Sequence, residues 1–106
     1  MKIKRIKEIL IGSTKFKMKW DKSCCSGAFS FGDDKEKAFI EIGVKGINEE
    51  YEFDVLLHEL SEIIHVVCHH RYQGTDCEDN YQFIMDHRAH TIHSTLLSAA
   101  IMKFIY

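Results

Sequence analysis

Residues 54–65 read DVLLHELSEIIH, and this stretch decides how the rest of the chain is interpreted. Its apolar residues recur every three or four positions, which is the spacing of one face of an α-helix. It also contains two histidines and two glutamates: His58, Glu59, Glu62 and His65. A helix buried only for packing would carry leucine or alanine at such positions. The stretch therefore predicts either a metal site built on a helix or an amphipathic helix with a polar side.

The length and composition fit one globular domain. The chain has 106 residues, of which 45% are hydrophobic, and this supports one modest core but not two. Strand patterns come first and helical patterns follow, so we expect an α+β fold. The prediction is a small antiparallel sheet of about three to four strands within residues 3–45, followed by two long packed helices at about 50–71 and 80–105.

The strand predictions depend on alternation. Residues 14–20 read TKFKMKW, so that lysines alternate with larger apolar residues, as on a strand with one wet face. Residues 26–44 read SGAFSFGDDKEKAFIEIGV, in which two alternating segments flank the polar run GDDKEK. This pattern predicts a hairpin with its turn at residues 32–37.

Charge is distributed unevenly along the chain. Residues 1–22 carry eight Lys or Arg against two acids, which leaves six basic residues against fourteen acids in the remainder. A basic segment suits nucleic acid or an acidic partner, but the alternation with apolar residues favours an ordinary strand, so nucleic acid is not expected. No segment approaches the roughly 18 apolar residues needed to span a bilayer, and we expect a cytoplasmic protein. The cysteines, which form no CxxC pair, are expected as free thiols: Cys24, Cys25, Cys68 and Cys77.

The spacing of His58 and Glu62 is the feature that points to a metal. Residues at i and i+4 lie one above the other on a helix, so this imidazole and this carboxylate can hold one ion. The arrangement is that of H-E-x-x-H with glutamate at the second ligand position. Zinc accepts carboxylate oxygen as well as imidazole nitrogen, and Glu59 beside the ion would serve as general base.

A third ligand has to come from another element. The second predicted helix begins with MDHRAHTIH at residues 85–93. Its periodicity turns Asp86, His90 or His93 inward and puts His87 on the far side. The histidines that end the first helix, His65, His69 and His70, fit a polar helix end. The last ten residues are apolar almost all round, so this end is either buried or the contact of a homodimer.

The order of these elements around LLHEL resembles the minimal zincin-type metallopeptidase domain of ImmA/IrrE-like proteins from phages and other mobile elements. The likeness covers roughly residues 14–100 and implies one zincin-like domain over residues 1–106. A narrower resemblance is to uncharacterised phage and bacterial proteins with H-E-L-x-E and a downstream acid–His pair, here MDHRAHTIHSTLL. That resemblance implies His87 as the third ligand, with His90 as the alternate.

Two functions follow from the resemblance. The first is a zinc-dependent metallohydrolase, peptidase-like, that acts on a protein or peptide in the cytoplasm, which is the host cytoplasm for a phage protein. Another divalent transition metal is the alternative to zinc. The second is a non-catalytic metal-binding protein that inhibits or contacts a host protein. Glu62 in place of a histidine lowers the charge of the ion, which favours metal binding over catalysis.

Overall fold

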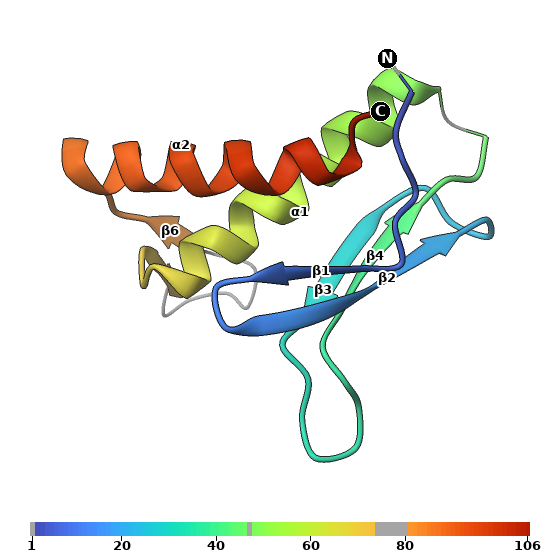
Figure 1. The fold of residues 1–106 in the computed structure, drawn as a ribbon. Coiled ribbons are helices and arrows are strands. Elements are labelled where there is room, and N and C mark those ends of the chain that lie inside the picture. Colours follow the sequence, from blue (N-terminus) through green and yellow to red (C-terminus); the bar gives the residue numbers. More distant parts are fainter. Residues whose placement is uncertain (1, 47, 74–80) are drawn as a thin grey trace.

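The computed structural model describes residues 2–46, 48–73 and 81–106. It confirms an α+β fold, in which the helix α1 lies against one face of a four-stranded sheet and α2 packs on α1 (Figure 1). The elements in chain order are β1 (Glu8–Ile11), β2 (Thr14–Asp21), β3 (Gly27–Ser30), β4 (Phe39–Gly43), α1 (Glu49–Val67), β5 (Arg71–Gln73), β6 (Tyr81–Phe83), α2 (His87–Ile101) and the 3₁₀ turn η1 (Met102–Phe104).

The sheet is mixed rather than purely antiparallel. Its strand order is β1-β2-β4-β3, and β2 pairs with β4 in parallel. The predicted hairpin is confirmed, because β3 and β4 pair antiparallel with Ser30 opposite Phe39. The second strand of that hairpin then inserts next to β2, which makes the parallel pair. Alternation predicts which face of a strand is buried, but it carries no information about the direction of its neighbour.

The core lies between the sheet and α1. Lys15 and Lys17 are exposed, while Phe16 and Met18 between them are buried. Ile40 and Ile42 of β4 point the same way. The completely buried side chains of α1 are Leu56, Leu60, Ile63 and Ile64. Burying one such side chain contributes about 1.5–3 kcal/mol, so this interface fixes how α1 is rotated on the sheet.

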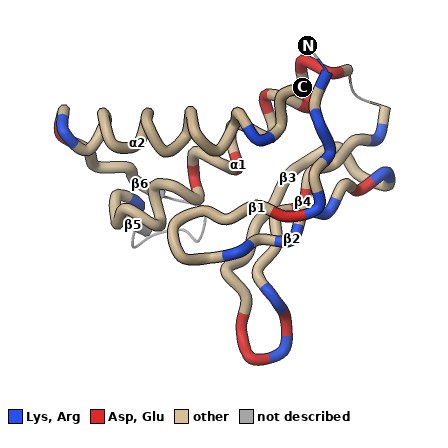
Figure 2. Tube along the Cα trace, in the orientation of Figure 1, with Lys and Arg blue, Asp and Glu red and all other residues tan. Residues whose placement is uncertain are grey.

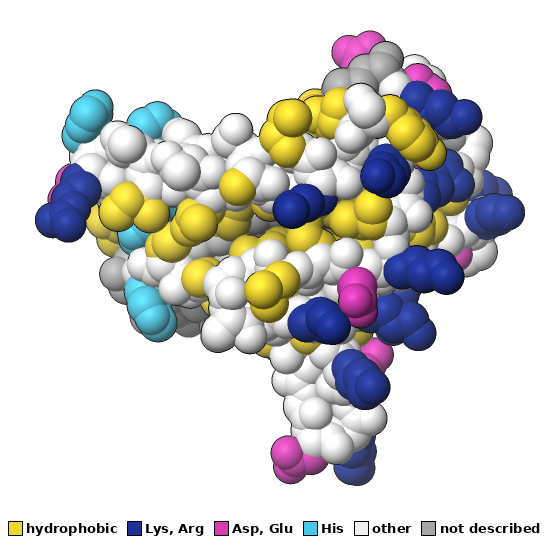
Figure 3. All heavy atoms as spheres, viewed as in Figure 1, with side chains coloured by type: hydrophobic (Ala, Val, Ile, Leu, Met, Phe, Trp, Pro, Cys, Tyr) yellow, Lys and Arg dark blue, Asp and Glu magenta, His cyan; other side chains and the backbone are white. Residues whose placement is uncertain are grey.

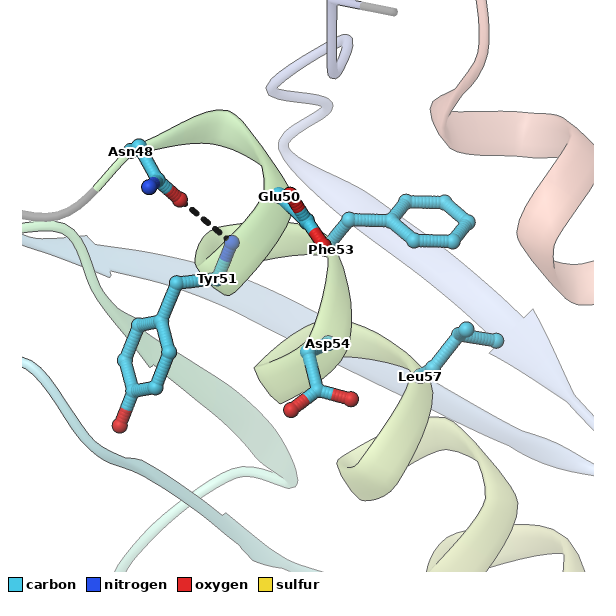
Figure 4. Close-up of a pocket in the computed structure, with 6 residues that line it drawn as sticks. All are labelled: Asn48, Glu50, Tyr51, Phe53, Asp54 and Leu57. Carbon is cyan, nitrogen blue, oxygen red and sulfur yellow. Dashed lines mark hydrogen bonds between the residues drawn. The ribbon is translucent and has the colours of Figure 1, made fainter.

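The helix α1 begins at a well-formed cap and stops earlier than the sequence pattern predicts. The side chain of Asn48 accepts a hydrogen bond from the Tyr51 amide (Figure 4), and acidic residues follow in the first turn. The helix ends at Val67 rather than at residue 71, because His69 adopts a left-handed backbone with φ of 60°. Such a residue ends a helix, as glycine or asparagine often does. A surface hollow beside the first two turns is lined by Asn48, Glu50, Tyr51, Phe53, Asp54 and Leu57 (Figure 4).

The helix α2 also starts later than predicted. Residues 81–83 form β6, which pairs with β5, so the prediction of helix from residue 80 was wrong. Asp86 is the N-cap, and its carboxylate accepts a hydrogen bond of 2.8 Å from the Ala89 amide. The two helices run in roughly opposite directions (Figure 1), and His93, in the second turn of α2, contacts Ser61 and His65 in the second half of α1.

The two ends of the described chain are joined. The Lys4 amide donates to the Phe104 carbonyl over 2.6 Å, and Ile3 forms a bridge with Ile105. The Phe104 ring is completely buried and meets the edge of Trp20 with 6.1 Å between ring centroids. The apolar C-terminal end is therefore buried at Ala100 and Phe104, whereas Met102 is exposed.

Replacement of Phe104 by alanine should lower the free energy of unfolding by about 3–5 kcal/mol, because it leaves a cavity where an aromatic ring fills the core. Met102→Ala, two residues away on the exposed side of the same turn, should cost less than about 0.5 kcal/mol. Urea unfolding followed by circular dichroism measures both values. Equal losses for the two variants would contradict the packing described for Phe104.

Candidate metal site on helix α1

The structure brings His58, Glu59 and Glu62 together on α1. One ligand atom from each residue lies within 4.8 Å of the other two. The closest approach joins His58 Nε2 to Glu62 Oε2 at 3.2 Å, one helical turn apart. The spacing read from the sequence thus places the imidazole and the carboxylate in direct contact, at a hydrogen-bonding distance that two donors to one ion also have.

The three residues differ in burial because α1 is half covered by the sheet. The His58 side chain is 71% exposed, while that of Glu62 is 17% exposed, and Glu59 is buried. Gly27 of β3 permits this arrangement, since a Cβ at that position would lie 2.8 Å from Glu59 Cγ. The strand therefore passes directly over Glu59, and the group opens to solvent on the His58 side.

Arg71, the first residue of β5, completes the charge balance of the group. Its Nη2 lies 3.4 Å from Glu62 Oε1, so Glu62 is shared between a guanidinium and an imidazole. The same guanidinium lies over the Phe29 ring, 5.4 Å from its centroid. Arg71 thereby links α1 to β3 and leaves Glu62 Oε2 turned towards His58.

The pKa of Glu59 is raised, chiefly by burial. The positive charges of His58 and Arg71 act to lower it, and the negative charge of Glu62 raises it further. A carboxylate whose pKa is raised is a better proton acceptor near neutral pH than an exposed one. The buried position and the raised pKa of Glu59 are properties that a general base commonly has.

The predicted third ligands lie elsewhere. His87 is the first residue of α2 and is exposed, as is His90. The contact between the helices at this end is made by His93, which reaches Ser61 and His65, whereas His58 lies at the middle of α1. Neither histidine belongs to the group of donor atoms formed by the described residues. The assignment of His87, or of His90 in its place, stays a prediction.

His93 is the histidine of α2 that points inward, as one of the alternatives from periodicity predicted. Its ring stacks on His65 with 4.1 Å between centroids, and its Nε2 lies 3.1 Å from Ser61 Oγ. His65 is buried between His93 and the Phe83 ring, 4.5 Å away. The interpretation of His65 as part of a polar helix end was therefore wrong. The two imidazoles are packing residues of the interface between the helices.

A second group of donor atoms was not visible in the sequence. Asp21, Cys24 and Glu41 bring one ligand atom each within 4.8 Å of the others. The Cys24 thiol donates to Asp21 Oδ2 over 3.5 Å. The Ser26 amide lowers the pKa of Cys24, but burial and the two carboxylates raise it above its usual value. Within the described residues, Cys24, Cys25 and Cys68 are free as expected, while Cys77 lies outside them.

Comparison with protein-family models, with curated proteins and with solved structures finds no match for this chain. The candidate site therefore stands on its own geometry. Among the described residues, no helix combines the length and the apolar character that crossing a membrane requires.

The stability of the fold should fall as the pH is lowered from about 6.5 to 4. Burial, followed by the neighbouring His93 and His70, lowers the pKa of His65 from 6.5 to about 4. Between pH 6.5 and 4 the unfolded chain therefore binds more protons than the folded chain. The free energy of unfolding, as far as His65 determines it, is highest above pH 6.5 and decreases as the pH falls. The loss reaches roughly 3 kcal/mol at its largest.

Urea unfolding at several pH values between 7 and 4 measures this dependence. His65→Leu should flatten the slope in this window, whereas His90→Leu on the exposed side of α2 should leave it unchanged. A slope that survives in His65→Leu would assign the dependence to other groups.

Proposed function

We propose that this chain binds a divalent transition metal, most simply Zn²⁺, through His58 and Glu62, and that it is a peptidase-like hydrolase with Glu59 as general base. The observation that carries the proposal is the cluster of three donor atoms within 4.8 Å on one helix. The described residues form a surface that is open on the His58 side, where a substrate and further ligands have access.

The distance between the two main donors fits zinc. Nitrogen and oxygen donors lie about 2.0–2.2 Å from Zn²⁺, so two donors at a tetrahedral angle are about 3.3 Å apart. His58 Nε2 and Glu62 Oε2 are 3.2 Å apart without rearrangement. Arg71 supports the site from outside, because it holds the other oxygen of Glu62 and so orients the carboxylate, as outer partners of metal ligands commonly do.

Each residue then has a defined task. Bound zinc would supply a Lewis acid that lowers the pKa of water and polarises a carbonyl group. Glu59 would accept the proton of the attacking water and later return it to the leaving group. Its burial beside Gly27 keeps the carboxylate in one orientation, and its raised pKa suits both steps.

The second candidate is a metal-binding protein without catalysis, which acts through contact with another protein. Glutamate at the second ligand position favours it, because a carboxylate ligand lowers the effective charge of the ion and so raises the pKa of bound water. The behaviour of Glu59 variants separates the two candidates.

Protein purified without added metal and then titrated with Zn²⁺ should bind one equivalent at this site. His58→Ala and Glu62→Ala should each weaken binding about 10-fold or more, because each removes one donor. Glu59→Gln should bind zinc as the wild type does. Elemental analysis and calorimetry give stoichiometry and affinity. Unchanged affinity in both His58→Ala and Glu62→Ala would eliminate the site.

His87→Ala and His90→Ala test the third ligand in the same titration. The variant that removes a true ligand should weaken zinc binding to a similar degree, while the other variant serves as its control. Full affinity in both variants would show that α2 contributes no ligand through these residues.

Glu59→Gln should abolish peptide hydrolysis while zinc remains bound. Loss of a general base lowers the rate by about 10²–10⁴, and the amide cannot accept the proton. Zinc-loaded wild type and variant are compared on a pool of unfolded proteins, with peptide release followed by mass spectrometry. Equal hydrolysis by both would overturn the role of Glu59, and no hydrolysis by either would favour the non-catalytic candidate.

A further inference from the structure

The face of the sheet opposite α1 is open and carries charges of both signs: Lys15, Lys17 and Lys19 project from β2, and Glu8 and Glu41 on the neighbouring strands lie opposite Lys17 and Lys19. No element among the described residues packs on it, and Leu10 at its edge is 65% exposed. Lys15 and Lys17 project from β2 on this side, because Phe16 and Met18 fill the core on the other. Lys and Arg side chains gather mainly on the sheet and the N-terminal segment in the face viewed in Figure 3, away from the histidines of α2.

A cavity of about 250 Å³ opens on this face and is bordered mostly by lysines. We call it the lysine groove. Its lining residues come from β2, from the loop of residues 31–38 that joins β3 to β4, and from the start of β4. Figure 2 shows that the backbone of this loop carries both basic and acidic residues. The lining of the groove is Lys17, Lys19, Lys35, Glu36, Lys37, Ala38 and Phe39. Four ammonium groups thus border one hollow with a single carboxylate.

The backbone around the groove is held in place by hydrogen bonds. Asp33 Oδ1 accepts from the amides of Lys35 and Glu36, both at 2.8 Å. The Asp33 amide donates to the Glu36 carbonyl, also at 2.8 Å. On the other side, the parallel pairing of β2 with β4 sets Lys17 beside Phe39. The positions from which the lysines project are therefore fixed before any ligand binds.

Most of the positive charge in the groove is not neutralised. Lys19 Nζ lies 3.3 Å from Glu36 Oε1 and 3.8 Å from the centre of the Phe39 ring. Lys17, Lys35 and Lys37 make no ion pair within the part of the chain that the structure describes. An exposed pair such as Lys19–Glu36 is worth less than about 1 kcal/mol, so an incoming anion displaces Glu36 at little cost.

We propose that the lysine groove binds the phosphate backbone of single-stranded nucleic acid. The groove continues along β2 as the row of Lys15, Lys17 and Lys19, in which alternate residues are about 6.6–7 Å apart. Lys15 Nζ lies 3.4 Å from Glu8 Oε1 in an exposed ion pair, which a phosphate can displace as it displaces Glu36 from Lys19. A row of charges fits an extended chain of phosphates better than one isolated anion. Phe39 lines the same groove, with the Lys19 ammonium 3.8 Å from the centre of its ring. A base that stacks on this face of the ring takes the place of Lys19.

The net charge of −2 is not the charge that a phosphate in the groove meets, because the groove itself is lined by four lysines and one glutamate. At physiological ionic strength, exposed charges act over about 8 Å, so a phosphate in the groove interacts chiefly with the local lysines. The inference does not depend on the proposed hydrolase, since it shares no residue with the metal site.

The test is fluorescence anisotropy with a labelled oligothymidylate of about 12 nucleotides, in buffer that contains EDTA. The triple variant Lys17→Glu, Lys19→Glu and Lys37→Glu should bind at least about 10-fold more weakly than the wild type. With three phosphates engaged, the logarithm of affinity should fall with the logarithm of salt with a slope of about −2. Phe39→Leu should weaken binding about 5-fold or more, through lost stacking.

The matched control replaces three exposed lysines outside the groove by glutamate: Lys22, Lys45 and Lys103. It carries the same net charge as the groove variant and should bind the oligonucleotide as the wild type does. Equal losses in the two triple variants would overturn the proposal, as would equal affinity for polyglutamate or for a mononucleotide. Circular dichroism shows that each variant is folded. His58→Ala should retain binding, so failure of the metal site and failure of this proposal are separate results.

Discussion

The contact between the apolar face of α1 and the inner face of the sheet sets the position of every polar group on that helix. Ile40 and Ile42 of β4 are completely buried, as are Leu60 and Ile63 of α1. A shift in helical phase by one residue would rotate the side chains by about 100° around the helix axis. This apolar face would then turn to solvent. Because the rotation is fixed, Glu59 lies under β3, and His58 and Glu62 lie at the open border of the same interface.

Neighbouring residues at that border differ in how far they are buried, and their chemical properties differ accordingly. Glu59 is buried, whereas the side chain of His58, one residue earlier in the helix, is mostly exposed. Glu62 is intermediate and is held by Arg71 from β5. A buried carboxylate thus lies beside two more accessible donor groups, and the proposed metal-assisted hydrolysis depends on this difference. On a fully exposed helix the same three side chains would not differ in burial in this way.

Local periodicity was enough to predict the parts of the structure that local geometry determines. The β3–β4 hairpin, most of α1 and the pairing of His58 with Glu62 all follow from residue spacings within one element. Contacts between distant segments were not predictable in this way. The parallel pairing of β2 with β4, the group of Asp21, Cys24 and Glu41, and the end of α1 at Val67 depend on neighbours or on the backbone of one residue. His65 was misread because a histidine near a helix end resembles a charged cap, while α2 buries it.

Ile3 forms a bridge with Ile105, and the Lys4 amide donates to the Phe104 carbonyl. These contacts join positions that are separated by almost the whole described chain. Closing so long a loop costs more conformational entropy than any hairpin does, and contacts of this kind slow folding. During synthesis the bridge of Ile3 has to wait until Ile105 has been made, whereas Ile6 and Arg5, a few residues further on, find partners in Trp20 and Glu52 much earlier. The segment before β1 can therefore dock on the sheet and α1 before its contact with residue 105 forms.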